Sequence, residues 1–402
     1  MKLDNLEIFV TKNKTPGKGG NYFIFVKVTT KCGIVGYGEV YATAVAPQTI
    51  RSVIEDVFER HMYDENPHNI ELMFRRAYSS GFSQRPDPTI IGAFSGLEIA
   101  CWDILGKSLN QPIYNLLGGK IRKQLRSYTY LYPEVNQDST EFYASPELSS
   151  EAAAKAVKMG FTAVKFDPAG PYTIFGGHQP TLQDLNLSIS FCSSIRKTVG
   201  EHADLLFGTH GQFTPSGAIR LAQSLEQYNP LWFEEPIPPE SPRNMQEVAK
   251  GTKIPIATGE RLTTKYEFSE VLRSGSAAIL QPALGRVGGI WEAKKISTIA
   301  EVFGAQIAPH LYAGPIEWAA NIQLSLTLPN FLLLESIETG GGFHSELLSS
   351  PIKWDNGYVV PSSEPGLGVE LNEEVAKSNL YYDKDLHLNM SLVEHLPNKP
   401  KT

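Results

Sequence analysis

The feature that most constrains this 402-residue chain is a repeating order of short apolar segments and amphipathic stretches after Lys120. The apolar segments have strand composition, and most are followed by apolar residues three and four positions apart, as in a helix. The strand candidates are SYTYLY, AVKFD, DLLFG, LWFEEP, PIATGE, AAILQPA, AQIAPH and FLLLES. This alternation predicts an α/β fold, a parallel (β/α)8 barrel. A doubly wound open sheet competes, but no glycine-rich phosphate fingerprint follows an early strand.

The first part of the chain follows a different pattern. LEIFV, NYFIFVKVTT and KCGIVGYGEV are rich in β-branched and aromatic residues and predict a sheet. TIRSVIEDVFERHM, NIELMFRRAYSS and FSGLEIACWDILGK have helical periodicity. We therefore expect an α+β capping domain over residues 1–120, a barrel with the active site over 121–350, and a tail over 351–402 that completes the cap.

The charge and hydropathy of the sequence limit the kinds of partner that the protein is expected to bind. The formal net charge is −7, from 36 basic and 43 acidic residues, and the basic residues form no long run. This argues against a nucleic-acid or anionic-membrane surface. No apolar stretch is expected to approach the ~18 residues that span a bilayer. Asp4 and Glu7 fall where a signal peptide would be apolar. We expect a cytoplasmic protein whose partner is a small molecule.

Polar residues recur where the predicted barrel strands end. In a barrel, the carboxyl ends of the strands form the mouth of the active site, so these side chains should converge. A single charge at a strand end is most often a solvated loop residue, but recurrence over seven successive strands indicates a site. The residues are Lys165, Asp167, His210, Glu234, Glu260, Gln281, His310 and Glu335.

Glu234 and Glu260 predict a metal site. Gly208, Glu234 and Glu260 follow one another at equal intervals, as expected when successive strand–helix units use the same rung. Carboxylates on adjacent strand ends form a hard-oxygen pocket that suits magnesium or manganese. Without a cation the two carboxylates would repel each other, and a divalent ion removes that conflict.

Longer motifs carry a resemblance over nearly the whole chain. SGLEIACWDILGKSLNQPIYNLLGG, AVKFD, HG, FEEP, TGER, QPALGRVGGI, PH and LLLES resemble the enolase superfamily, mandelate racemase/muconate lactonizing enzyme subgroup. The closest resemblance is to its galactonate-type sugar-acid dehydratases. It implies a modified enolase-like barrel, one divalent metal with magnesium expected, and a homo-oligomer. The implied reaction is abstraction of the α-proton of a sugar acid through an enediolate and then dehydration, which makes the chain a carbon–oxygen lyase.

The resemblance assigns roles to matching positions. Glu234 and Glu260 correspond to metal ligands. His310 corresponds to the general base, and His210 to the histidine that gives a proton to the departing hydroxyl. Glu335 corresponds to the glutamate that hydrogen-bonds the substrate carboxylate. In a closed eight-stranded barrel, His310 and His210 follow strands four apart, so we expect them to face each other across the mouth.

Two positions depart from the family pattern. Gly208 stands where the first metal-ligating carboxylate is usual, and Ala283 stands where an aspartate partners the base. Lys165 matches the first lysine of the second-strand motif, whereas Asp167 replaces the second. We expect Lys165, Asp167 and Gln281 to contact the substrate.

These departures leave alternatives open. Asp167 or His210 could complete the metal site, and an imidazole ligand would shift preference toward manganese or another transition metal. Gln281 could hold the ring of His310 but would supply no charge. Racemisation, epimerisation or cycloisomerisation would share the first half of the reaction. The alternative from a different functional class is a protein that binds sugar acids but has lost catalytic activity.

Overall fold

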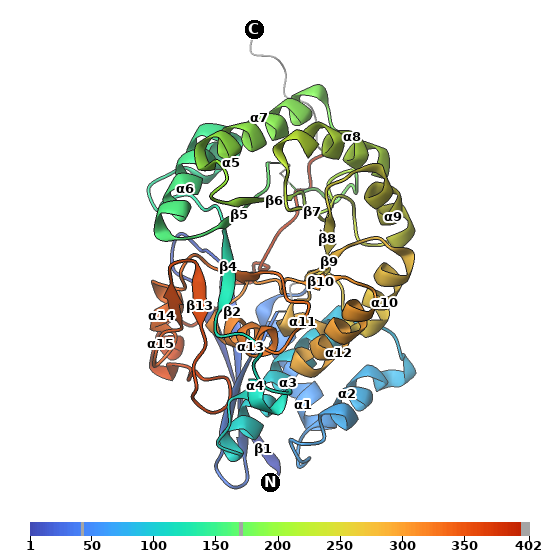
Figure 1. The fold of residues 1–402 in the computed structure, drawn as a ribbon. Helices are drawn as coiled ribbons and strands as arrows, with labels where there is room; N and C mark the ends of the chain where they lie inside the picture. Colours follow the sequence, from blue (N-terminus) through green and yellow to red (C-terminus); the bar gives the residue numbers. More distant parts are fainter. Residues whose placement is uncertain (42–43, 169–171, 395–402) are drawn as a thin grey trace. The chain divides into compact units, whose positions relative to one another are not determined.

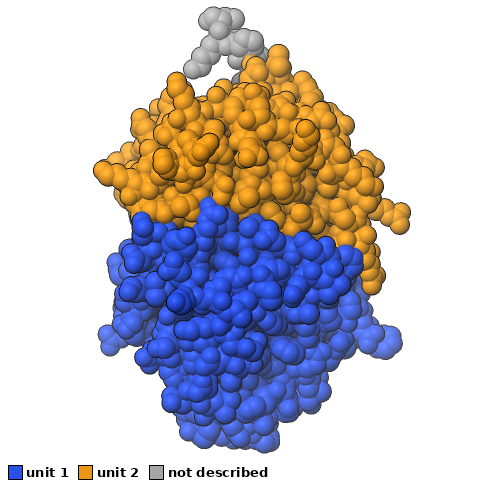
Figure 2. Space-filling view, viewed as in Figure 1, with its two compact units in different colours: residues 1–126, 259–269, 281–388 blue, residues 127–258, 270–280, 389–402 orange. Residues whose placement is uncertain are grey.

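The computed structural model describes residues 1–41, 44–168 and 172–394. The backbone divides into two compact units, each assembled from segments far apart in the sequence (Figure 2). Unit 1 comprises residues 1–126, 259–269 and 281–388, and unit 2 comprises residues 127–258, 270–280 and 389–402. The domain boundaries expected from the sequence stay a prediction.

Unit 1 begins with an antiparallel sheet in the order β1-β2-β3 (Figure 1). Its strands are β1 (Leu3–Lys12), β2 (Tyr22–Thr30) and β3 (Val35–Val40). The central strand β2 is buried along most of its length, and Phe25 and Val26 are fully inaccessible to solvent. The strands predicted from β-branched and aromatic composition are confirmed.

The predicted helices of this region are α1 (Pro47–His61), α2 (Ile70–Tyr78) and α3 (Pro88–Ser108). Asp87 is the N-cap residue of α3, and its side chain accepts hydrogen bonds from the amides of Thr89 and Ile90. It packs closely on β3, because a Cβ on Gly38 would lie 1.8 Å from the carbonyl oxygen of Gly96. Glycine is therefore required where the helix crosses the strand.

Within the part of the chain that the structure describes, α3 is the one helix long and apolar enough to cross a membrane. The expectation that no stretch reached this length was therefore wrong. However, 89% of its most apolar window is buried inside the protein. The helix is apolar on all sides because it packs against β3, α1, α11 and α12 of the same unit.

The remaining described elements of unit 1 surround this core. They are η1 (Ser80–Phe82), α4 (Ile113–Leu116), α11 (Leu284–Val287), α12 (Gly289–Val302), β10 (Gln306–Ile307), α13 (Pro315–Ser325), β11 (Leu334–Ser336), α14 (Phe343–Glu346), β12 (Lys353–Asp355), β13 (Tyr358–Val360) and α15 (Glu373–Ser378). The tail packs on the N-terminal sheet. The amide of Lys12 donates to the carbonyl of Asn379, and Lys27 forms an ion pair with Glu373 at 2.8 Å.

Unit 2 is built from parallel strands with helices between them (Figure 1). Its strands are neighbours in chain order: β4 (Leu125–Tyr130), β5 (Ala163–Phe166), β6 (Asp204–Gly208), β7 (Trp232–Glu234), β8 (Ile256–Thr258) and β9 (Ile279–Leu280). The helices are α5 (Ser139–Ala144), α6 (Pro146–Met159), α7 (Leu182–Val199), η2 (Glu226–Tyr228), α8 (Pro215–Leu225), α9 (Pro242–Gly251) and α10 (Thr264–Ser274). Strand β4 and helix α10 each have residues in both units. The predicted alternation of strand and helix is confirmed.

Candidate active site

The carboxyl ends of β5, β6 and β7 gather predicted site residues of unit 2. Gly208 pairs with Glu234 across β6 and β7, and Lys165 pairs with Leu206 across β5 and β6. Because parallel strands present their carboxyl ends at the same edge, the side chains meet there. The Lys165 Nζ lies 2.5 Å from Glu234 Oε1, and the two side chains are 3% and 2% exposed. A carboxylate buried this deeply needs such a counter-charge.

A second pair at this edge joins Asp167 and His210. Asp167 follows β5 directly, and its Oδ2 lies 2.5 Å from Nδ1 of His210. The hydroxyl of Tyr172 donates to the same oxygen at 3.0 Å, and the Tyr172 ring lies 4.6 Å from the imidazole between centroids. A carboxylate at Nδ1 favours a proton there, so chemistry at this residue falls to Nε2.

The turn that carries His210 is hydrogen-bonded to the residue that follows β7. The amide of Gly211 and the hydroxyl of Thr209 both donate to the carbonyl of Glu235, at 2.6 and 3.0 Å. His210 itself has a φ of 44°. This left-handed conformation is uncommon for a residue with a side chain and is found mostly where the surrounding structure fixes it.

Packing does not require glycine at position 208. A Cβ there would lie 3.8 Å from Glu234 Cβ and 4.0 Å from Lys165 Cε, which are ordinary contacts. The position therefore has room for the first atom of a side chain beside a buried carboxylate and a buried ammonium group.

In unit 1, Glu260 lies beside His310. Glu260 follows β8 by two residues, and its Oε2 is 3.6 Å from His310 Nε2. Both residues are buried, at 7% and 4% exposure. The alanine at 283 led us to expect no carboxylate partner for His310. The structure places Glu260 there as an electrostatic partner.

The backbone around His310 is held on both sides. Its amide donates to the carbonyl of Pro282 at 3.2 Å, and its carbonyl accepts from the Asn321 side chain at 3.0 Å. The next amide, that of Leu311, donates to Oε2 of Glu335 at 2.8 Å. Glu335, predicted as a substrate contact, thus also fixes the residue that follows His310.

Gln281 and Ala283 follow β9 and are both fully buried. The backbone of Gln281 lies beside the segment that carries Glu260, as a Cβ on Gly259 would be 3.0 Å from the backbone nitrogen of Gln281. Its predicted role in holding the His310 ring stays a prediction.

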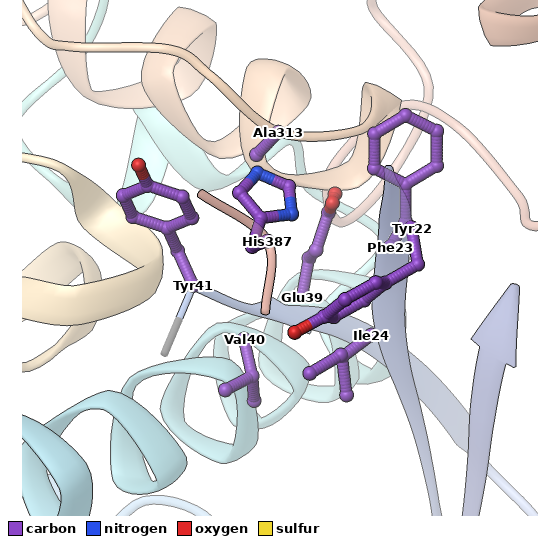
Figure 3. A pocket seen from close by; sticks show the side chains of 8 residues that line it. All are labelled: Tyr22, Phe23, Ile24, Glu39, Val40, Tyr41, Ala313 and His387. Atoms are coloured by element: carbon purple, nitrogen blue, oxygen red, sulfur yellow. The ribbon is translucent and has the colours of Figure 1, made fainter. Parts of the chain in front are cut away.

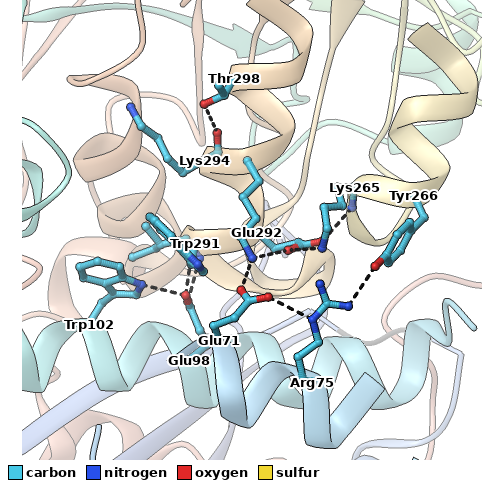
Figure 4. Close-up of polar contacts among 12 residues, drawn as sticks. Glu71, Arg75, Glu98, Trp102, Lys265, Tyr266, Trp291, Glu292, Lys294 and Thr298 are labelled. Carbon is cyan, nitrogen blue, oxygen red and sulfur yellow. Dashed lines mark hydrogen bonds and ion pairs between the residues drawn. The ribbon is translucent and has the colours of Figure 1, made fainter. Parts of the chain in front are cut away.

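A buried polar network holds the segment after Glu260 (Figure 4). The amide and the Nζ of Lys265 both contact Oε1 of Glu292, at 3.0 and 2.9 Å. Glu98 of α3 accepts from Trp102 Nε1 at 2.8 Å and from the amide of Trp291 at 2.9 Å. These contacts join both α3 and the segment after Glu260 to α12.

Two sequence profiles match the chain. One, described as "Mandelate racemase / muconate lactonizing enzyme, N-terminal domain", matches residues 11–118, and one described as "Enolase C-terminal domain-like" matches residues 148–375. The chain belongs to the mandelate racemase/muconate lactonizing enzyme group of the enolase superfamily.

Solved structures and curated relatives agree with this family assignment. A mandelate racemase/muconate lactonizing enzyme from Sulfitobacter sp. is 59% identical, with a TM-score of 0.96 over 98% of this chain and 99% of that one. The D-gluconate/D-galactonate dehydratase of Picrophilus torridus is 34% identical, over 89% of this chain and 88% of its own length. The D-xylonate dehydratase of Haloferax volcanii is 30% identical, over 92% and 89%. The predicted fold class, an enolase-like barrel with an α+β capping domain, is confirmed.

Some residues of this family member were not singled out from the sequence. Tyr172 lies in a Gly- and Pro-rich loop without periodicity, so no pattern placed it beside Asp167. Arg286 lies in the QPALGRVGGI motif, and it donates to the carbonyl of Glu260 at 3.1 Å and covers the Tyr41 ring at 4.5 Å. The ring of Tyr41 is 5.5 Å from that of His310. Only the folded chain brings these residues together.

Proposed function

We propose that the chain is a metal-dependent dehydratase of sugar acids, which removes the proton next to the carboxylate and the hydroxyl on the next carbon. The named activities of the relatives from Picrophilus torridus and Haloferax volcanii confirm the predicted class, a carbon–oxygen lyase acting on such acids. The observation that carries the proposal is the Asp167–His210 pair at 2.5 Å. Elimination needs a second proton-transfer group beside the base, and an oriented imidazole suits that role. Racemisation and cycloisomerisation have no observation in their favour.

We propose Glu234 and Glu260 as metal ligands, and His210 as a third ligand only where its Nε2 is not the proton donor, because a ring nitrogen bound to a metal carries no proton. They are donors of the kind that hold a metal ion. Strands β7 and β8 are hydrogen-bonded neighbours with Glu234 opposite Ala257, and Glu260 follows Ala257 by three residues. A divalent cation supplies positive charge where negative charge develops as the α-proton leaves. The family suggests magnesium, whereas the imidazole favours manganese or another transition metal.

The proposed roles of the chain's residues balance an elimination. His310 accepts the proton from the α-carbon, and Glu260 lies beside the resulting imidazolium. His210 donates a proton from Nε2 to the leaving hydroxyl, while Asp167 holds its ring. The C–H and C–O bonds break, water departs, and the enol that remains becomes a 2-oxo-3-deoxy acid.

The proposed substrate contacts are buried polar residues near the ends of the predicted barrel strands. Lys165, Asp167, Gln281 and Glu335 are buried polar residues that can bind the carboxylate and hydroxyls of a sugar acid. Buried, oriented polar groups of this kind discriminate strongly among hydroxylated substrates, since a mismatch leaves one of them unpaired.

The test is turnover in heavy water. Protein stripped with EDTA is reloaded with Mg²⁺, Mn²⁺ or Zn²⁺ and incubated with D-gluconate, D-galactonate, D-xylonate and their diastereomers. We expect at least one acid to yield a 2-oxo acid. Neither product nor α-deuterium with any acid and metal would favour a binding protein instead. Deuterium without loss of water would favour an isomerase.

Two variants separate the histidine roles. His310→Asn should stop deuterium exchange at the α-carbon, because the base is lost. His210→Asn should slow dehydration while leaving some exchange, provided that the variant still binds metal by calorimetry. Exchange at the normal rate in His310→Asn would place the base elsewhere.

The assembly and location follow the same proposal. We propose a homo-oligomer in the cytoplasm that binds neither nucleic acid nor membranes, in keeping with its net charge of −7. Light scattering of the purified protein measures the first, and fractionation of the source cells measures the second. A monomer at micromolar concentration, or a membrane-pelleted protein, would overturn the corresponding part.

A further inference from the structure

The segment 310–314 leads from His310 into α13, and buried histidines bind its carbonyl groups. Nε2 of His387, in the C-terminal tail, lies 3.0 Å from the carbonyl oxygen of Tyr312. Nε2 of His344, in α14, lies 3.2 Å from that of Ala313. Both imidazoles are buried, at 5% exposure each. Because a carbonyl oxygen only accepts, each Nε2 must carry the proton.

Buried carboxyl groups bind the amides of the same segment. The amide of Leu311 donates to Glu335, as described above, and the amide of Gly314 donates to Oε1 of Glu39 at 2.5 Å. Glu39 is the fifth residue of β3 and is 1% exposed. Four side chains of unit 1 therefore bind the backbone that follows His310, and paired backbone groups are what a rigid buried segment requires.

The two histidines are suited to this task because they stay neutral. Burial lowers the pKa of His344 and of His387 to about 4. At neutral pH each ring therefore keeps a single N–H, and the bonded carbonyl determines which nitrogen carries it.

His387 also contacts the ring that covers His310. Figure 3 shows the His387 imidazole with Tyr41, Tyr22 and Ala313 around it. Its centroid is 5.4 Å from that of Tyr41 and 5.3 Å from that of Tyr22, both edge-on. The Tyr41 ring is in turn 5.5 Å from His310.

The fit around His387 is tight. A Cβ on Gly20 would lie 1.8 Å from Cε1 of His387, so the imidazole occupies the space above that glycine. In the adjoining cavity, the space that the centre of a water molecule can occupy is only about 10 Å³, which is room for about one water. The ring therefore has little freedom to move, and neither does the carbonyl it binds.

We infer that His387 is a positioning residue for His310, acting through the Tyr312 carbonyl and the Tyr41 ring. His344 binds the neighbouring carbonyl, that of Ala313, and so supports the same segment. The inference rests on the proposed function, in which His310 takes the α-proton. It gives the C-terminal tail a part in the reaction. A base displaced by ~1 Å can lose about a hundredfold in rate, so the fixation of this backbone matters for turnover.

The experiment compares three substitutions. His387→Gln keeps an N–H that can reach the Tyr312 carbonyl. His387→Met fills similar space without a donor. His202→Gln, at an exposed position in unit 2, is the matched control. Each protein is assayed for α-proton exchange and dehydration at a temperature where circular dichroism shows it folded.

We expect His387→Met to lower kcat by about tenfold or more with KM within about threefold, because the base is misplaced while substrate contacts remain. His387→Gln should stay within about threefold of the parent protein. Equal kcat for His387→Met and the parent, or an equal loss in His387→Gln, would overturn the inference. If His387→Met does not fold, His387→Asn takes its place, since its shorter amide stops short of the carbonyl.

A measurement without substrate separates this inference from the proposed function. Amide hydrogen exchange at Leu311 and Gly314 should speed up in His387→Met but not in His387→Gln. If the parent protein turns over no acid, the proposed function fails. The comparison still tests the clamp, by which we mean the four side chains that bind residues 310–314 (Glu39, Glu335, His344 and His387). Unchanged protection in every variant would overturn the clamp even in an active enzyme.

Discussion

The ammonium group of Lys165 lies 2.5 Å from a carboxylate oxygen of Glu234, and both side chains are almost fully buried. The ion pair lies next to Gly208, where the family pattern led us to expect a third acidic residue. Lys165 therefore supplies positive charge to the carboxylate that we propose as a metal ligand. A cation arriving at Glu234 binds the other carboxylate oxygen, shares Oε1 with the ammonium group or displaces that group.

We first predict that Lys165→Met destabilises the metal-free protein by about 3 kcal/mol, because it removes a positive charge 2.5 Å from a buried carboxylate. Added Mn²⁺ should restore most of that loss, since the cation replaces the lost charge. Urea unfolding with EDTA and with Mn²⁺ measures both values. Lys158→Met, at an exposed position on α6, is the control. An equal loss with and without metal would show that the cation does not bind at Glu234.

The second prediction concerns the room at position 208. Gly208→Asp places a carboxylate beside Glu234 without a backbone clash, since the nearest contacts of its Cβ would be at 3.8 and 4.0 Å. Metal affinity should rise by about tenfold, because another negatively charged oxygen joins the site. Calorimetry with Mg²⁺ and Mn²⁺ gives the dissociation constants. Gly208→Asn has the same shape without the charge, so equal affinities for the two variants would refute the argument.

The strands could be predicted from sequence because their signals are local. AVKFD, DLLFG and LWFEEP have the composition of buried strands and fold as β5, β6 and β7. Placing Lys165, Asp167, His210 and Glu234 at one edge then needs only the rule that parallel strands end together. The family motifs added the roles of these residues, which composition alone would not have given.

The partners of these residues could not be predicted, because they depend on tertiary packing. Nothing in the sequence indicates that Asp167 holds His210, or that Glu260 lies beside His310. The clamp on residues 310–314 combines side chains from β3, α14 and the tail, whose contacts no periodicity encodes. Glu39 offered one signal, a carboxylate in an otherwise apolar strand, which usually means a buried partner.

The third prediction follows from the Asp167–His210 pair. Asp167→Asn should lower the dehydration rate by about 10- to 100-fold, because the amide no longer favours a proton on Nδ1 of His210. Tyr172→Phe should cost less, since it removes one hydrogen bond to Asp167 and leaves the carboxylate. Steady-state kinetics measures both, with metal content checked by elemental analysis. Equal rates for Asp167→Asn and the parent, at equal metal content, would remove His210 from the proton-transfer step.

The last prediction concerns the pH dependence of stability. Burial, with a smaller contribution from the Glu317 charge, raises the pKa of Glu39 from 4.5 to about 8. The unfolded chain therefore releases this proton at lower pH than the folded one. The contribution of protonated Glu39 to the free energy of unfolding is therefore complete below about pH 4.5. It is lost as the pH rises through 8. Burial also raises the pKa of Glu98 to about 8, which adds a loss in the same window.

Glu39→Gln should therefore flatten the decline of the free energy of unfolding between pH 5 and 8, by up to about 1.4 kcal/mol per pH unit. Its advantage over the parent protein should grow as the pH rises. Urea unfolding across this range measures the slope, and Glu55→Gln, at an exposed position on α1, is the control. Parallel curves for Glu39→Gln and the parent would mean that Glu39 ionises in the folded protein at an ordinary pH. Its hydrogen bond from the Gly314 amide would then involve a carboxylate and not a neutral acid.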